Sequence, residues 1–206
     1  MPKVFQFIRS RLKEGRQAYV VYPRVEETDD GTVKAVITEF EKLQSALAPY
    51  RVGLLHGRLP PEQKEKVAEQ FRKNQVQVLL ATSIIEVGVD VPNATVMLIE
   101  NAEQFGLAQL HQIRGRVGRG CYESYCILIA DPKTRDARQR LRVLEKSNDG
   151  FFIAEADLSL RGPGELLGQE QSGSPSFRFA NLAGDALLVE KARDLARQLL
   201  DQNQVI

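Results

Sequence analysis

Three arginines and three glycines fall within the seven residues from Arg114 to Gly120. Arginine carries a planar, permanently charged group that pairs bidentately with phosphate oxygens, and a neighbouring glycine lets the backbone approach a ligand closely. Arg116 and Arg119 are three residues apart, so one helical turn would place both guanidinium groups on the same side. The stretch is suited to binding a nucleotide's terminal phosphates or to stabilising transition-state charge. A loop on a nucleic-acid backbone, or a surface turn without a ligand, fits the spacing about as well.

The composition excludes several classes of protein. The chain has 206 residues, 43% of them hydrophobic, which is enough for an ordinary core. Lys and Arg number 28 against 27 Asp and Glu, so any phosphate binding must come from local clusters. Two cysteines, Cys121 and Cys126, are too few for a disulfide framework and lack the partners of a zinc site. Without a signal peptide or a long apolar run, we expect a cytoplasmic protein.

Apolar runs alternate with amphipathic segments through the first 131 residues. Strands are predicted at 17–22, 51–55, 76–81, 95–99 and 125–130, and helices at 2–15, 36–47, 60–72 and from residue 107. Continuous apolar strands separated by helices are typical of right-handed βαβ units and a parallel sheet. The predicted fold class is therefore α/β, with helices covering both faces of the sheet in three layers.

The segment 26–34 is predicted to be a solvated turn. Polar pairs follow four of the predicted strands. The pairs are Tyr22-Pro23, His56-Gly57, Thr82-Ser83 and Glu100-Asn101. Ligands of open α/β sheets bind at the carboxyl ends of the strands, so we expect one functional edge, with the arginine stretch following the fourth pair.

The pattern changes after residue 131. The segment 134–148 is predicted to be one amphipathic helix, with Arg135, Arg138 and Arg142 on a face that is either solvated or a nucleic-acid surface. The segment 151–173 is broken by glycines and is predicted to be a loop with brief helical turns, and a last helix is expected from residue 184. The predicted domains are thus a sheet-containing lobe, 1–131, and a helical appendage with a glycine-rich loop, 132–206.

The parts that usually cradle a nucleotide are missing from the sequence. It contains no Gly-Lys pair of a phosphate loop and no Asp-Glu pair of the kind that holds Mg²⁺ beside one. An arginine donor without these partners indicates the second half of a two-lobed motor. We therefore expect the chain alone to be inactive.

Five blocks of sequence strengthen this interpretation, because together they resemble the second RecA-like lobe of superfamily 2 helicases. They are Leu55-His56-Gly57, Phe71-Arg72, Val78 to Thr82, Glu86 to Pro92, and Gln112-x-x-Gly115-Arg116-x-x-Arg119.

A narrower resemblance is to the RecG and Mfd translocase families. It is carried by Ile99 to Gln112 and by Arg161-Gly162-Pro163-Gly164-Glu165, followed by Gln171-Ser172-Gly173. Pro163, Asn101-Ala102 and Ser124-Tyr125-Cys126 favour RecG over Mfd.

This resemblance implies an ATP-driven double-strand DNA translocase that regresses stalled replication forks and moves Holliday junctions in repair and recombination. The partners implied are branched DNA and the first lobe and wedge domain of the same protein, with no membrane. ATP and Mg²⁺ are the cofactors implied for the full-length protein, with none bound to this chain alone.

The residues implied for these roles follow from the matching motifs. Gly88, Asp90 and Gln112 match positions at the nucleotide, and Arg116 and Arg119 match arginine fingers. Gly57 and Thr82 match positions on the DNA backbone, although Thr82 could equally just end a strand. Arg161 and Gln171, held among glycines, are predicted to couple ATP-driven closure to DNA movement, and no metal ligand is expected.

Two alternatives remain open. One is an Mfd-like translocase that displaces RNA polymerase. The other is a binding module that has the fold without the chemistry. Gln112, Arg116 and Arg119 favour a motor, because a pure binding module has no need of arginine fingers.

Overall fold

The computed structural model describes residues 2–23, 30–82 and 90–161, together with Lys191 and Leu195. The chain divides into two compact units, Met1–Asn148 and Asp149–Ile206. The first unit contains the sheet.

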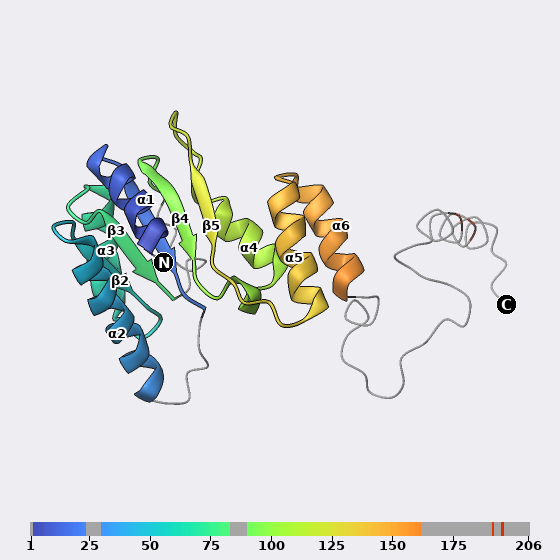
Figure 1. Cartoon of the computed structure of the whole chain (residues 1–206), viewed down its shortest axis with the longest axis horizontal. Helices are drawn as coiled ribbons and strands as arrows, with labels where there is room; N and C mark the ends of the chain where they lie inside the picture. The colour runs from blue at the N-terminus through green and yellow to red at the C-terminus, as the bar shows by residue number, and fades with distance from the viewer. Residues whose placement is uncertain (1, 24–29, 83–89, 162–190, 192–194, 196–206) are drawn as a thin grey trace, which may run out of the picture. The chain divides into compact units, whose positions relative to one another are not determined.

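Five parallel strands form this sheet in the order β2-β3-β1-β4-β5 (Figure 1). They are β1 (Gln17–Val21), β2 (Val52–Leu55), β3 (Val78–Ala81), β4 (Ala94–Ile99) and β5 (Tyr125–Leu128). In β1, β3 and β4 every residue is buried, as expected for a parallel sheet covered on both faces. The predicted α/β fold with a parallel sheet is confirmed.

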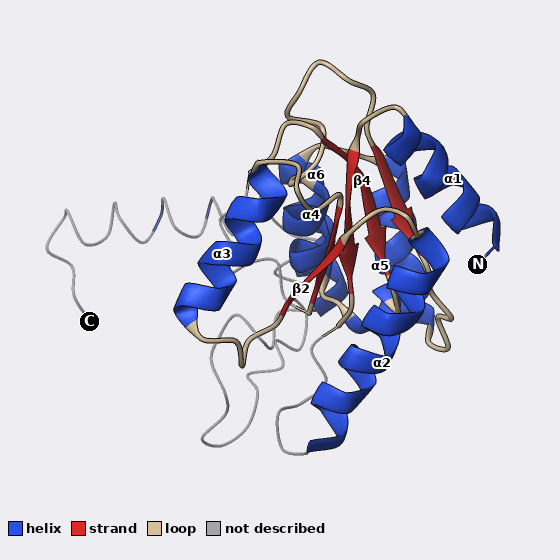
Figure 2. Ribbon diagram, turned by 90° about the vertical axis from the view of Figure 1, so that its left-hand side faces the viewer, coloured by secondary structure: helices blue, strands red, loops and turns tan. Residues whose placement is uncertain are grey.

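Helices cover both faces of the sheet, in three layers (Figure 2). α1 (Pro2–Lys13) and α2 (Asp30–Leu47) pack on one face through Ile8 and Leu43, which join Val20 of β1 in a buried cluster. On the opposite face, α3 (Pro61–Arg72) places the buried ring of Phe71 5.0 Å from that of Tyr19. The neighbours Tyr19 and Val20 thus point to opposite layers, as the two-residue period of a strand requires.

The chain between β4 and the end of the first unit adds a 3₁₀ turn and two helices. The turn is η1 (Ala102–Gln104), and the helices are α4 (Leu107–Arg114) and α5 (Arg135–Lys146). α5 packs on α4 and η1, so the contacts group this helix with the sheet. The sequence-based boundary at residue 131 instead separates α5 from the sheet.

Two helices differ from the prediction. α2 begins at Asp30, so the turn predicted for 26–34 is wrong from residue 30 onward; an acidic residue favours a helix's first turn as readily as a loop. In the second unit, α6 (Gly150–Arg161) is a continuous helix where a loop was predicted. Its eleven residues after Gly150 contain no Gly or Pro, and the glycines that suggested a loop begin only at Gly162.

The rest of the second unit lies outside the described residues, apart from Lys191 and Leu195, which are helical. Among the described helices, none is long and apolar enough to cross a membrane.

Candidate functional site

The arginine stretch begins on α4 and continues as a loop. α4 buries Leu107, Leu110 and Ile113, and its last residue is Arg114. Gly118 then has a φ of +82°, a left-handed conformation that favours glycine. Arg116 and Arg119 therefore lie on the loop, which we call the arginine loop (Gly115–Gly120). The expectation that a helical turn aligns them is wrong, because the helix ends before either residue.

Asp90 holds the side chain of Arg119. Nη1 of Arg119 lies 2.7 Å from Oδ2 of Asp90, and Nε donates a hydrogen bond of 2.9 Å to the carbonyl of Gly115. These contacts fix the guanidinium between the loop and Asp90. With 47% of the Arg119 side chain and 45% of the Asp90 side chain exposed, both remain accessible to a ligand.

Tyr19 shows that Arg116 belongs to the same cluster. Burial raises the pKa of the Tyr19 hydroxyl, and the nearby Asp90 carboxylate raises it further, whereas Arg116 and Arg119 lower it. The tyrosine is thus close enough to interact with one carboxylate and two guanidinium groups, on the face of the sheet that α3 covers. Asp90, Arg116 and Arg119 therefore lie near the same tyrosine, and their role as a nucleotide site stays a prediction.

The end of the arginine loop is held against the segment that leads into β4. A Cβ atom at Gly120 would lie 2.6 Å from the carbonyl oxygen of Pro92, so only glycine fits without displacing backbone. Nearby, the guanidinium of Arg16 lies 3.3 Å from the ring centroid of Tyr122, and its Nη1 donates to Oδ1 of Asn93. The chain just after Arg119 is therefore held at Gly120 and again at Tyr122.

The predicted site residues fall at two edges of the sheet rather than one. Gly57 and Thr82 follow β2 and β3, at the carboxyl edge. Asp90 precedes β4, and Arg119 precedes β5, at the amino edge. The expectation of a single functional edge is wrong because α4 runs back along the sheet and delivers the arginine loop to the opposite end.

The other predicted residues have different surroundings. Gly57 is exposed in a turn, and Gln112 is exposed on α4. Thr82 is only 9% exposed, and its N–H donates to the carbonyl of Leu55. Arg161 is the last residue of α6, whereas Gly88 and Gln171 lie outside the described residues.

Charges of opposite sign occupy different parts of the carboxyl edge. Beyond the outer strand β2, burial and the cations Lys64 and Arg58 lower the pKa of His56. Beyond the inner strand β4, burial and the nearby Glu39 raise the pKa of Glu100. The cations near β2 therefore favour an anion such as a phosphate there.

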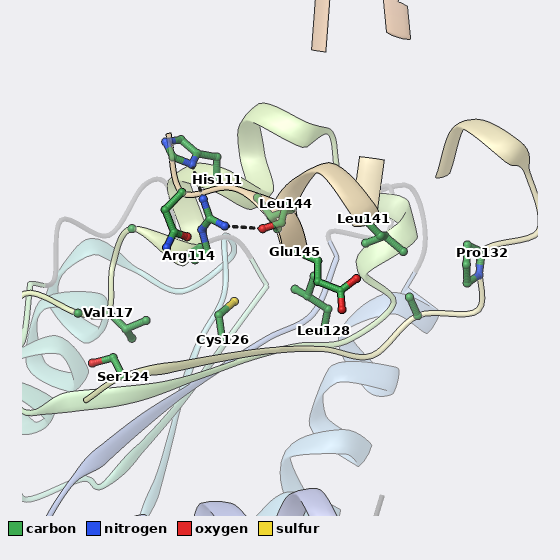
Figure 3. Close-up of a pocket in the computed structure, with 14 residues that line it drawn as sticks. His111, Arg114, Val117, Ser124, Cys126, Leu128, Pro132, Leu141, Leu144 and Glu145 are labelled. Atoms are coloured by element: carbon green, nitrogen blue, oxygen red, sulfur yellow. Dashed lines mark hydrogen bonds between the residues drawn. The ribbon is translucent and has the colours of Figure 1, made fainter. Parts of the chain in front are cut away.

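Sequence reasoning missed the role of Arg114, which joins α4 to α5. Its Nη1 donates to the carbonyl of Leu144 (2.6 Å), and its Nη2 lies 3.1 Å from Nδ1 of His111 (Figure 3). Nη1 also donates to the carbonyl of Ser147 (2.9 Å). The guanidinium thus caps carbonyls at the end of α5, and burial lowers its pKa. Backbone carbonyls are present in every sequence, so no residue pattern reveals such a contact.

A pocket of about 830 Å³ adjoins Arg114, between α4, β5 and α5. Cys126 and Leu128 from β5 form one wall, and Leu141 and Leu144 from α5 form another (Figure 3). Burial raises the pKa of the Cys126 thiol to about 11, although the Arg114 charge opposes this effect. Within the described part of the chain, no three His, Cys, Asp or Glu side chains form a group that could hold a metal ion.

Comparison with known proteins identifies two families that match parts of the chain. Residues 2–121 match the family described as the helicase conserved C-terminal domain. The chain belongs to this helicase family. Residues 147–206 match a second family, described as "ATP-dependent DNA helicase RecG, domain 3, C-terminal".

Individual relatives of this helicase lobe agree with the family match. The chain is 51% identical over 200 residues to the ATP-dependent DNA helicase RecG of Synechocystis and 44% identical over 201 residues to that of Bacillus subtilis. These alignments cover 97% of the chain but only 24% and 30% of the two relatives, so the chain spans less than a third of the length of each. A solved structure described as RecG bound to a three-way DNA junction is similar with a TM-score of 0.69 and 44% identity, over 91% of this chain and 24% of that one.

Proposed function

We propose that the chain is the C-terminal motor lobe of an ATP-dependent double-strand DNA translocase that remodels branched DNA in repair and recombination. The observation that carries the proposal is the arginine loop, in which Arg119 is fixed on Asp90 beside Arg116 and stays half exposed. The RecG relatives and the RecG structure with a DNA junction support the choice of branched DNA as the substrate. We also propose that the protein is cytoplasmic.

The donor set of the arginine loop fits a nucleotide triphosphate. ATP with Mg²⁺, when bound between this lobe and a first lobe that carries the phosphate loop, supplies the phosphoryl group whose transfer to water drives the motor. Arg116 and Arg119 stabilise the charge on the transferred group, and Asp90 holds Arg119 in position before closure. Gly88, Asp90 and Gln112 contact the nucleotide.

DNA contacts belong to the opposite edge of the sheet. Gly57 and Thr82 lie there, and the cations Lys64 and Arg58, which lower the pKa of His56, give this edge a positive potential next to β2. The nucleotide and the DNA backbone thus bind at different ends of the same strands, and the partners of the lobe are branched DNA, the first lobe and a wedge domain.

The direct test compares the full-length protein with this chain alone. We expect the full-length protein to hydrolyse ATP with stimulation by branched DNA and to regress model forks, because both lobes are needed for the nucleotide site. The chain alone should release no phosphate above background. A DNA-stimulated rate of the isolated chain that survives further purification would contradict the two-lobe proposal.

The same assays separate the alternatives. DNA binding without hydrolysis by the full-length protein indicates a binding module. Displacement of stalled RNA polymerase without fork regression indicates an Mfd-like translocase.

Arg161 and Gln171 are proposed to couple hydrolysis to DNA movement. In the full-length protein we expect Arg161→Ala and Gln171→Ala to preserve DNA-stimulated hydrolysis but to abolish fork regression, because a residue that transmits motion need not touch the nucleotide. Thermal melting of each variant controls for misfolding. Regression that falls only in proportion to hydrolysis would argue against a coupling role.

A further inference from the structure

α5 has an inner face that fixes its orientation on the lobe. Ala137 and Leu144 are buried against the lobe. On the same side, Arg140 donates hydrogen bonds to the carbonyls of Phe105 (2.9 Å) and Glu103 (3.4 Å). Arg114 holds the other end of the helix through the carbonyl of Leu144. With contacts at both ends, the helix cannot roll about its axis without breaking hydrogen bonds to partly buried groups.

The outer face of α5 is a line of cations. Arg135, Arg138, Arg142 and Lys146 are all exposed, and they follow one another at intervals of three, four and four residues. At 100° per residue their mean direction is opposite to that of Ala137 and Leu144. We call these four residues the basic stripe. At about 1.5 Å per residue the stripe is roughly 17 Å long.

The lobe's own fold makes little use of the basic stripe. Among the described residues, no ion pair involves any of the four side chains. Within the same part of the chain, Arg138 alone of the four forms a side-chain hydrogen bond, from Nε to the carbonyl of Pro132. The two acids of α5, Asp136 and Glu145, lie on the flanks of the stripe rather than within it. In a chain with a net charge of only +1, this is a strong local concentration of positive charge.

We propose that the basic stripe of α5 is a docking surface for the phosphate backbone of double-stranded DNA. Arginine groups pair with phosphate in bidentate geometry, and three of the four cations are arginines. A line of roughly 17 Å exceeds the about 12 Å width of the major groove of B-DNA, so its ends can reach phosphates on both sides. Backbone contacts of this kind carry no sequence information, which suits a translocase that moves along any DNA.

The inference rests on the proposed function and adds to it a contact far from the carboxyl edge of β2 and β3. α5 is joined by Arg114 to α4, and α4 leads directly into the arginine loop. A duplex held on the basic stripe is thus connected to the nucleotide residues through one side chain and one short helix.

The test is the salt dependence of DNA binding by the full-length protein. The variant replaces the whole stripe: Arg135→Gln, Arg138→Gln, Arg142→Gln and Lys146→Gln. The matched control removes four exposed cations elsewhere on the lobe: Lys3→Gln, Lys13→Gln, Arg51→Gln and Lys66→Gln. Binding to an unbranched duplex of about 30 base pairs is followed by fluorescence anisotropy between roughly 50 and 200 mM salt.

We expect the stripe variant to bind the duplex at least about tenfold more weakly at the lower salt concentration, and the slope of log K against log salt to fall by about 0.9 for each phosphate that the variant no longer neutralises. The control should keep the wild-type slope, and a variant with Lys at all three arginine positions should keep most of it. ATP hydrolysis without DNA, together with thermal melting, should be unchanged in all variants.

A stripe variant with the affinity and slope of the control would overturn the inference, and would leave an acidic protein surface as the partner of the stripe. This result differs from failure of the proposed function, in which the wild-type full-length protein itself neither binds DNA nor hydrolyses ATP.

Discussion

Arg119→Ala in the full-length protein is expected to lower ATP turnover by about 10³- to 10⁵-fold while leaving DNA affinity nearly unchanged. The guanidinium is held by Asp90 at 2.7 Å and by the carbonyl of Gly115 at 2.9 Å, so it is already oriented before a nucleotide arrives. A donor fixed in advance acts on charge that develops only in the transition state, and its loss therefore lowers kcat more than it weakens binding. Arg116→Ala should behave in the same way.

Arg16→Ala is the matched control for this prediction. Arg16 also lies at the amino edge, but its guanidinium is stacked on Tyr122 and bonded to Asn93. Its removal should leave turnover within a few-fold of wild type. The measurement is steady-state hydrolysis with saturating branched DNA, alongside anisotropy binding of the same DNA. Parallel losses of DNA affinity and turnover in Arg119→Ala would instead make Arg119 a contact to the DNA backbone.

Arg114→Ala is expected to lower the free energy of unfolding of this chain by about 2–3 kcal/mol, because it leaves partly buried carbonyls without a donor. Those carbonyls belong to Leu144 and Ser147, at the end of α5. The truncation also leaves an empty space beside the pocket of about 830 Å³. Few neighbouring side chains can move in to fill this space, which adds to the loss of stability. Urea denaturation should show a lower midpoint with an unchanged slope m.

The control for Arg114 is Arg138→Ala, which removes the same kind of side chain from the exposed face of the neighbouring helix. It loses one hydrogen bond, to the carbonyl of Pro132, and should change stability by no more than about 0.5 kcal/mol. Arg114→Met separates the two contributions, because methionine fills much of the volume without donating hydrogen bonds. Equal midpoints for Arg114→Ala and Arg138→Ala would show that the link between α4 and α5 contributes nothing to stability.

The strands were predictable because each is a largely apolar run, and four of the five are followed by a polar pair, a pattern typical of a doubly covered parallel sheet. α6 was not predictable in the same way. Its apolar residues, beginning with Phe151 and Phe152, lie on every side of the helix rather than on one stripe, and the glycines on either side resemble loop residues. The start of α2 at Asp30 was missed for a related reason, since acids and glycine suit a turn and a first helical turn alike.

The proposed members of the candidate site come from the sequence, but their arrangement does not. Asp90, Arg116 and Arg119 follow from the resemblance, and the structure brings them together. Their position at the amino edge could not be read from the sequence, because the direction of α4 along the sheet is a tertiary property. Arg114 was hidden for a chemical reason: a guanidinium that bonds backbone carbonyls has no partner side chain to reveal it.

The close approach of Gly120 to Pro92 limits how the length of this segment can vary among sequences. Gly118 supplies a left-handed turn, and Gly120 supplies the place where the two backbones touch, so Arg119 is held between two positions that each require glycine. An insertion or deletion between these glycines would move one of them out of its place and carry Arg119 away from Asp90. We therefore expect relatives that keep the ion pair to vary in length only after Gly120, in the segment 121–124 that leads to β5.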